Sequence, residues 1–315
     1  MGCSRARGAG STGVWRAVIA LARTVARWLG PGLALGCLSV PALGAEPAPR
    51  PSDPDAPARS RAAQTRANVA FEGDLGAVLW TRRLEWEGDP AETLRGYRLV
   101  GVAPGVAAQG IWYPGAHTTR SAAAHVGLLG RYFRGFPRGA QREGRSFNTR
   151  TQEYELGLRG RIPFRPFELG LSVAYGAHDY EIDWYTDPDM PVVASVGYRF
   201  FRPGLEVRLR TERWVLELSG GLRVVGEAGE LGSSWFFPEL AGYGLDGTLG
   251  VGRRLTSSVT LLATGGMERY QFALRPDSAA PGPLGSAERV VDQYTAAALL
   301  LRWSLPGVRP GPGAK

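Results

Sequence analysis

The chain has 315 residues, of which 44 are glycine and 11 are tyrosine, with only three histidines and two cysteines. This composition suits many short strands and tight turns better than the helical core of an enzyme. The formal charge is +8, but five arginines and no acid lie in residues 1–45, so the remainder carries +3 and gives no electrostatic reason to expect a nucleic-acid partner.

The first 45 residues have the organisation of a secretory signal peptide. Basic residues up to Arg27 precede an apolar run over 28–40, and small residues follow at 42–45. We expect cleavage after Gly44 or Ala45. An alternative is a lipoprotein box at 34–37, with Cys37 acylated, although leucine stands there where a small residue is usual. Cys3 and Cys37 both lie in this segment, so the mature chain offers no disulfide and no cysteine metal site.

Residues 46–67 are rich in proline, alanine and arginine and predict an extended linker that buries no core. The folded part begins near Asn68. No later segment has the 18 or so uninterrupted apolar residues that a membrane helix needs, so a membrane-embedded chain must form a closed barrel.

From Asn148 onward, and upstream in 126–132, the apolar pattern has a period of two. In 151–162, Tyr154, Leu156 and Leu158 fall on one face, and the other face carries charged residues. This is typical of a strand between two different environments. The same alternation occurs in 126–132, 167–176, 214–224, 243–252 and 291–305. Residues 69–113 are less regular, and we expect two strands there.

The connections alternate in length. Long polar loops are expected near 87–94, 135–149, 178–190, 227–237 and 275–288, and short turns near 114–119, 163–166, 211–213 and 253–257. This alternation predicts an all-β, up-and-down antiparallel transmembrane β-barrel of about ten strands. Arg202-Pro203-Gly204 leaves the count open, because it reads as a bulge within one strand or as a hairpin, with eight or twelve strands as alternatives.

Aromatic residues stand where such strands would meet a lipid boundary: Trp80, Trp86, Trp112, Tyr113, Phe164, Phe167, Trp184, Tyr185, Trp214, Trp235, Phe236, Phe237 and Trp303. They predict interfacial girdles, or alternatively the core of a soluble β-protein. Together with the signal peptide and the alternating strands, they make residues 68–305 resemble the bacterial outer-membrane, porin-like β-barrels. That family commonly ends in an aromatic residue, whereas Trp303-Ser304-Leu305 is followed here by a tail, 306–315, expected to be disordered.

Ten charged residues fall on the face opposite the apolar one, with acids and arginines balanced: Glu153, Glu155, Arg159, Arg161, Glu206, Arg208, Arg210, Glu217, Arg223 and Asp246. Charges buried together must pair, so we expect one ion network in the lumen. A lumen of about ten strands leaves no wide channel once these side chains fill it, although a selective narrow pore is an alternative.

Two catalytic interpretations are weak. The segment His178-Asp179-Tyr180-Glu181, with Asp187-Pro188-Asp189, is similar to the sites of omptin surface proteases, but in omptins the two pairs come from different loops. His117, Ser121 and His125 are the other candidates, for a lipid hydrolase. We therefore expect no enzyme, no metal and no cofactor.

The sequence predicts a Gram-negative outer-membrane barrel with a structural, surface or narrow-transport role, in contact with membrane lipid and lipopolysaccharide. The alternative is a soluble or lipid-anchored periplasmic β-barrel or sandwich that binds an apolar ligand. The two differ in sidedness, because the apolar face points outward in the first and inward in the second.

Overall fold

The computed structural model describes residues 69–88, 96–99, 101–119, 121–142, 145–164, 166–182, 195–233, 237, 239–275 and 287–307. The predicted signal peptide, with Cys37, the linker, and the tail beyond residue 307 lie outside the described residues. Among those described, no helix is long and apolar enough to cross a bilayer.

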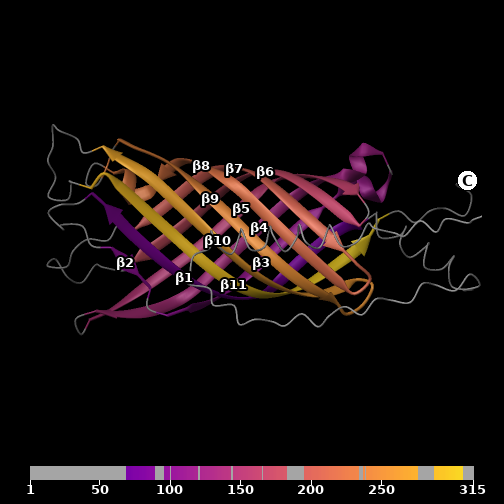
Figure 1. Cartoon of the computed structure of the whole chain (residues 1–315), viewed down its shortest axis with the longest axis horizontal. Coiled ribbons are helices and arrows are strands. Elements are labelled where there is room, and N and C mark those ends of the chain that lie inside the picture. Colours follow the sequence, from indigo (N-terminus) through magenta and orange to yellow (C-terminus); the bar gives the residue numbers. More distant parts are fainter. Residues whose placement is uncertain are drawn as a thin grey trace, which may run out of the picture. The chain divides into compact units, whose positions relative to one another are not determined.

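Ten long antiparallel strands close into a barrel, each paired with its neighbour along the chain (Figure 1). They are β1 (Val69–Glu87), β3 (Ala103–Trp112), β4 (Val126–Arg142), β5 (Arg145–Phe164), β6 (Phe167–Ile182), β7 (Val196–Arg210), β8 (Trp214–Ala228), β9 (Glu239–Arg254), β10 (Val259–Arg275) and β11 (Arg289–Pro306). Pairing of β1 with β11 closes the barrel, and β2 (Tyr97–Arg98) adds two residues beside β1. The predicted fold class is confirmed.

The two ends of the barrel differ in their connections. At the end that carries Val69 and Pro306, here called the turn end, β5–β6, β7–β8 and β9–β10 are joined across 165–166, 211–213 and 255–258, and β3–β4 across 113–125. The last of these is longer than predicted and contains the short 3-10 helices η1 (Pro114–His117) and η2 (Ala122–His125). The opposite end is called the loop end.

Two of the predicted loops at the loop end are wrong in extent. Residues 135–149 are not a loop. The strand β4 continues to Arg142, β5 begins at Arg145, and the two strands pair along that length. The strand β6 likewise runs to Ile182, so His178 to Glu181 belong to a strand. Both predictions took polar residues as a sign of a loop, whereas polar strand residues also occur where a barrel leaves lipid.

The segment Arg202-Pro203-Gly204 lies inside β7 and forms no hairpin. The register between β7 and β8 shifts instead between Arg199 and Phe200. Inward positions stay even-numbered along β7, from Tyr198 and Phe200 to Arg208. The apolar parity in the sequence therefore changes because the contents of the lumen change, from aromatic near the loop end to charged near the turn end.

The apolar face of the strands points outward. Leu156 is 69% exposed and Leu171 50%, whereas Glu155, which precedes Leu156 on the same strand, is only 1% exposed. Burial of the charged face and exposure of the apolar one is the sidedness of a barrel in lipid. The apolar-ligand alternative requires the reverse arrangement.

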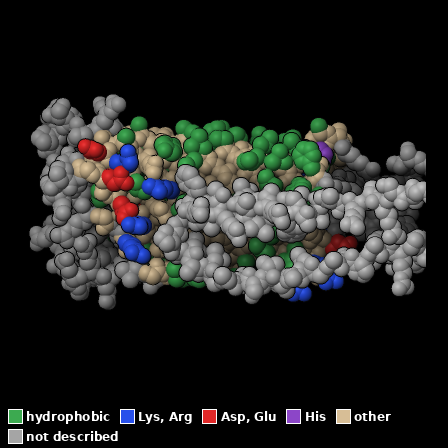
Figure 2. Space-filling model, in the orientation of Figure 1, with side chains coloured by type: hydrophobic (Ala, Val, Ile, Leu, Met, Phe, Trp, Pro, Cys, Tyr) green, Lys and Arg blue, Asp and Glu red, His purple; other side chains and the backbone are tan. Residues whose placement is uncertain are grey.

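This polarity inverts toward the loop end. On β1 the outward positions beyond Leu79 are polar, with Thr81, Arg83 and Glu85, whereas the inward Trp80 and Leu84 are buried. Charged side chains accordingly gather at the left end of the barrel in Figure 2, beside a long hydrophobic surface. The barrel thus has an apolar belt with a charged interior and, nearer the loop end, a projecting zone with a polar outside and an apolar interior.

Exposed aromatic side chains lie at both boundaries of the apolar belt. Toward the turn end they are Trp112, Phe164 and Trp214; toward the loop end they are Tyr132, Tyr154, Tyr175, Phe201 and Tyr243. On β5, ten residues separate Tyr154 from Phe164, which at about 3.3 Å per residue and roughly 40° of tilt corresponds to a belt about 25 Å tall.

Several of the aromatic residues predicted for the girdles lie elsewhere. Trp80, Tyr113 and Phe237 are 2%, 1% and 0% exposed and belong to the interior. Trp184, Tyr185, Trp235 and Phe236 lie outside the described residues. The sequence alone did not separate interfacial aromatic residues from interior ones, because both kinds lie near strand ends.

Candidate functional site

The lumen of the apolar belt holds two groups of ion-paired side chains. The ten charged residues predicted for the lumen all lie on inward strand positions, and six of them are buried: Glu153, Glu155, Arg159, Arg161, Arg208 and Arg223. Nine of the ten divide between the two groups, together with acids and arginines that the sequence analysis did not select, and Arg161 lies outside both groups. Among the described residues, no ion pair joins one group to the other.

The group nearer the turn end is centred on Arg208. Its Nη1 lies 2.7 Å from Glu72 Oε1, and its Nη2 lies 2.8 Å from Glu206 Oε1. Arg302 bridges Asp74 and Glu217, with Nε 2.6 Å from Asp74 Oδ1. The remaining members are Arg159, Arg210 and Glu168. This turn-side group links strands on opposite walls, because β1 and β11 contribute Glu72, Asp74 and Arg302 while β7 contributes Arg208.

The second group lies nearer the loop end and is called the central group. Arg223 Nη2 lies 2.8 Å from Glu153 Oε1 and 2.9 Å from Glu268 Oε1, and its Nε lies 3.2 Å from Asp246 Oδ2. Arg202 holds Asp246 through two hydrogen bonds, of 2.7 and 2.5 Å. The other members are Arg131 and Glu155. Four carboxylates therefore face three guanidinium groups here.

Beyond the central group, the interior of the projecting zone is aromatic. This aromatic layer contains Trp80, Tyr180, Tyr198, Phe200, Tyr270, Phe272 and Tyr294, all 5% exposed or less. The ring of Tyr198 stacks on that of Tyr270 with centroids 4.1 Å apart. One ion pair, Arg82 with Asp292, is enclosed in this layer, and the Arg82 guanidinium lies 3.9 Å from the centre of the Tyr180 ring.

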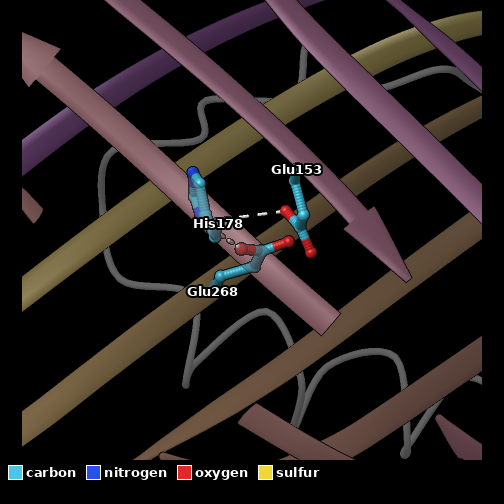
Figure 3. A group of neighbouring side chains, drawn as sticks. All are labelled: Glu153, His178 and Glu268. Atoms are coloured by element: carbon cyan, nitrogen blue, oxygen red, sulfur yellow. Dashed lines mark ion pairs between the residues drawn. The ribbon is translucent and has the colours of Figure 1, made fainter. Parts of the chain in front are cut away.

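His178 lies between the aromatic layer and the central group, together with Glu153 and Glu268 (Figure 3). The three side chains come from β6, β5 and β10 and converge inside the lumen. The His178 Nδ1 atom is 3.7 Å from Glu153 Oε2 and 3.6 Å from Glu268 Oε2. The prediction that His178 belongs to a surface loop is therefore wrong, because its side chain is 1% exposed. Asp187 and Asp189, the other half of that predicted pair, lie outside the described residues.

A cavity of about 260 Å³ lies in the lumen beside these groups. Charged side chains of both groups line it, among them Glu153, Arg208 and Arg302. Small side chains also line it, including Ala107, Ala296, Thr248 and Gly266. These short side chains leave space in the lumen that the charged groups do not fill.

At the turn end, Tyr113 closes over the lumen beside two arginines. Arg159 donates to the Tyr113 hydroxyl, and the Arg161 guanidinium lies 3.8 Å from the centre of its ring. Arg161 also donates to the Ala124 carbonyl at 3.0 Å, so it holds η2 rather than a carboxylate of the network. Burial and the neighbouring Arg161 lower the pKa of the His125 imidazole.

The three residues considered for a lipid hydrolase are close in sequence but do not form a catalytic pair. His117 accepts a hydrogen bond from Trp112 Nε1 at 3.3 Å, and the Ser121 backbone N–H donates to Thr119. Among the described residues, no hydrogen bond joins Ser121 to His117 or His125.

Sequence reasoning missed much of the interior. Glu72, Asp74 and Arg82 lie on β1, where the inward positions mix charged and apolar residues and hide the period of two. Glu268 and Asp292 lie on β10 and β11 at the same parity as the buried Tyr270 and Tyr294. A period of two extended along both strands is the signal that could have found them.

A closed antiparallel barrel with an apolar outer belt, aromatic residues at both boundaries and ion pairs inside is a membrane barrel. Its architecture is that of the bacterial outer-membrane β-barrels.

No family model matches the sequence, and no curated protein does. Among solved structures, the outer membrane protease OmpT of Escherichia coli is similar at a TM-score of 0.44 and 11% identity, over 75% of this chain and 96% of that one. Ail of Yersinia pestis, an attachment invasion locus protein, is similar at a TM-score of 0.28 and 11% identity, over 73% of this chain and 98% of that one. OprG of Pseudomonas aeruginosa is similar at a TM-score of 0.30 and 11% identity, over 76% of this chain and 97% of that one. The likeness concerns architecture only.

Proposed function

We propose that this chain is a Gram-negative outer-membrane protein whose barrel is filled and which serves a structural or surface role. The observation that carries the proposal is the layered interior, with the turn-side group, the central group and the aromatic layer in series along the barrel. In this proposal the barrel spans the membrane without acting as a general diffusion channel.

The apolar belt supports the membrane placement. Its height of about 25 Å equals the outward apolar band of outer-membrane barrels. Leucine side chains such as Leu156 and Leu205 would be costly to leave in water over so large a continuous surface. The order of basic, apolar and small residues in 1–45 supplies the route of export.

The orientation follows from the connections. Short turns face the periplasm in this class of protein, so the turn end faces the periplasm and the projecting zone faces the cell exterior. Arginines on the outer face of that zone, including Arg83 and Arg199, then lie level with the phosphates and sugars of lipopolysaccharide. Lipopolysaccharide is therefore the proposed lipid partner.

The filled lumen supports a role other than general diffusion. Arg208 and Glu72 pair from opposite walls across the lumen, so a large solute would have to break a buried ion pair to pass. The cavity of about 260 Å³ favours a second candidate, narrow transport of a small polar solute. No enzymatic role is proposed, because the side chain of His178 is buried inside the lumen.

Two measurements test these proposals. Fractionation of cells, followed by detergent extraction and gel mobility with and without heating, should find a heat-modifiable protein in the outer membrane. Release by osmotic shock without detergent would contradict the membrane placement. Planar-bilayer recording of the refolded full chain should find no persistent conductance. Small, ohmic, long-lived steps would favour narrow transport, and steps as large as those of general porins would contradict the filled lumen.

A further inference from the structure

Inside the lumen, Glu153, His178 and Glu268 present three ligand-type atoms that lie within 4.8 Å of one another. We propose that these side chains bind one divalent transition-metal ion of the Zn²⁺ type. The inference goes beyond the proposed function, because it holds whether or not the barrel conducts.

The tautomer of His178 follows from its surroundings. The Thr151 hydroxyl donates its one proton to the Asp179 carbonyl at 3.1 Å, so toward His178 Nε2, also 3.1 Å away, it accepts. The Nε2 atom therefore carries a proton. In the neutral ring, the lone pair of Nδ1 then faces the two carboxylates (Figure 3).

A nitrogen lone pair opposite carboxylate oxygens is repulsive unless a positive charge lies between them. The oxygen Oε2 of Glu268 is buried and has no hydrogen-bond partner. The central group also has one guanidinium fewer than it has carboxylates. Both observations indicate that a positive charge belongs at this point.

The distances favour a metal ion over a proton on Nδ1. A hydrogen bond from an imidazolium would bring nitrogen and oxygen to about 2.7–3.2 Å. Here Nδ1 is 3.5 Å from the Tyr270 hydroxyl, 3.6 Å from Glu268 and 3.7 Å from Glu153. Atoms that share a tetrahedral Zn²⁺ at about 2.0–2.2 Å lie roughly 3.4 Å apart, close to the 3.6 and 3.7 Å between Nδ1 and the two carboxylate oxygens.

The ligand set and its supports suit such an ion. One imidazole nitrogen with two carboxylates is a donor set for Zn²⁺ and its neighbours, whereas Mg²⁺ and Ca²⁺ prefer oxygen alone. Arg223 holds Oε1 of both Glu153 and Glu268, so each Oε2 is left to face His178. The adjoining cavity, which all three residues line, gives room for water as a fourth ligand.

Zn²⁺ and Co²⁺ are the probes. The full chain, refolded in detergent and stripped with a chelator, is dialysed against Zn²⁺, and bound metal is counted by mass spectrometry. We expect one ion per folded barrel. His178→Ala and Glu268→Gln should weaken binding at least ~10-fold, since even groups that only orient ligands contribute that much. His117→Ala is the matched control, because His117 lies at the exposed turn end, and it should bind as the parent does.

Co²⁺ gives a second readout, because its visible absorption bands report an ordered nitrogen and oxygen ligand field. These bands should appear in the parent and in His117→Ala and disappear in His178→Ala. Heat-modifiable mobility shows which preparations are folded, and only folded protein is compared. A folded parent that retains no Zn²⁺, or a folded His178→Ala barrel that binds as tightly as the parent, would overturn the proposal.

Discussion

Arg82 and Asp292 form a two-point ion pair across the seam at which β1 and β11 close the barrel. The Nε and Nη2 atoms of Arg82 donate to the two carboxylate oxygens at 2.9 and 2.8 Å, and both side chains are fully buried. Tyr198, on the opposite wall in β7, donates to the same carboxylate at 2.8 Å. The pair thus joins the first strand, the last strand and the far wall in one contact.

Removing one partner should destabilise the barrel strongly. We expect Arg82→Met to lower the free energy of unfolding by about 3–5 kcal/mol, because it leaves the Asp292 charge buried without its guanidinium. Urea unfolding of the barrel in lipid vesicles, followed by tryptophan fluorescence, measures the change. A double variant, Arg82→Met with Asp292→Leu, should recover part of it, because no charge is then left buried.

The same seam supplies a control. Arg289 and Glu87 also pair β11 with β1, at 3.1 Å, but their side chains are 57% and 52% exposed. Arg289→Met should therefore change stability by no more than about 1 kcal/mol. Equal effects of Arg82→Met and Arg289→Met would mean that burial is not what makes the seam pair matter.

The sequence predicted the fold well where the two faces of a strand differ throughout. On β5, the charged inward residues from Glu153 to Arg161 alternate with apolar outward ones, and both the strand and its sidedness are readable. On β1 the inward face passes from Glu72 to Trp80 while the outward face passes from Leu75 to Arg83. Because both faces change polarity at the boundary of the apolar belt, no single pattern runs along that strand.

The candidate site was predictable only in part, for a related reason. The period of two identifies which residues point into the lumen. It does not give their height along the barrel axis or their ion-pair partners, because both depend on strand register and tilt. Thus Arg223 and Arg208 were both assigned to the lumen, yet they belong to separate groups. His178 was assigned to a loop because the residues around it are polar, and only the length of β6 places it inside.

A charge placed on the apolar belt tests whether lipid surrounds it. Leu158 lies near the middle of the belt on β5 and is 51% exposed. In lipid, Leu158→Arg should lower the free energy of unfolding by about 2–4 kcal/mol and slow insertion into vesicles. On a water-exposed surface the same change would be within about 0.5 kcal/mol. Glu212→Arg, in an exposed turn, is the control and should be silent in either case.

Inward glycines make room for the large lumen side chains. A Cβ added at Gly221 would lie 2.7 Å from Arg202 Nε and 2.8 Å from its Cζ. Arg202 is 2% exposed and fixed on Asp246, so it has little freedom to move aside. We expect Gly221→Ala to destabilise the barrel by about 1–3 kcal/mol, as overpacking does.

Gly265, at an outward position of β10, is the comparison, because a Cβ there meets no atom within 4 Å. Gly265→Ala should be neutral, or stabilising by about 0.5–1 kcal/mol through the entropy of the unfolded chain. Urea unfolding of both variants in the same lipid measures the difference. A Gly221→Ala barrel as stable as Gly265→Ala would show that the packing around Arg202 is looser than its contacts indicate.

Opening the lumen should require changes on both sides of the cavity. Trp80 lines it toward the aromatic layer and packs edge-on against Phe133 and Tyr180, and Arg208 lines it toward the turn end. Arg208→Ala removes the side chain at the centre of the turn-side group and so opens the lumen there. Glu72 still pairs with Arg210 and Glu206 with Arg159, so these carboxylates are not left buried without a partner. The two blocks act in series, and removing either alone leaves the other in place.

Planar-bilayer recording should therefore find no persistent conductance in Trp80→Ala or in Arg208→Ala, and small, stable steps in the double variant. Trp214→Ala controls for the loss of a tryptophan, because Trp214 is 43% exposed on the outer face and does not line the cavity. Comparison is restricted to heat-modifiable, folded protein. Conductance in Trp80→Ala alone would mean that the turn-side group does not close the lumen, and a silent double variant would place the barrier elsewhere, in the central group around Arg223.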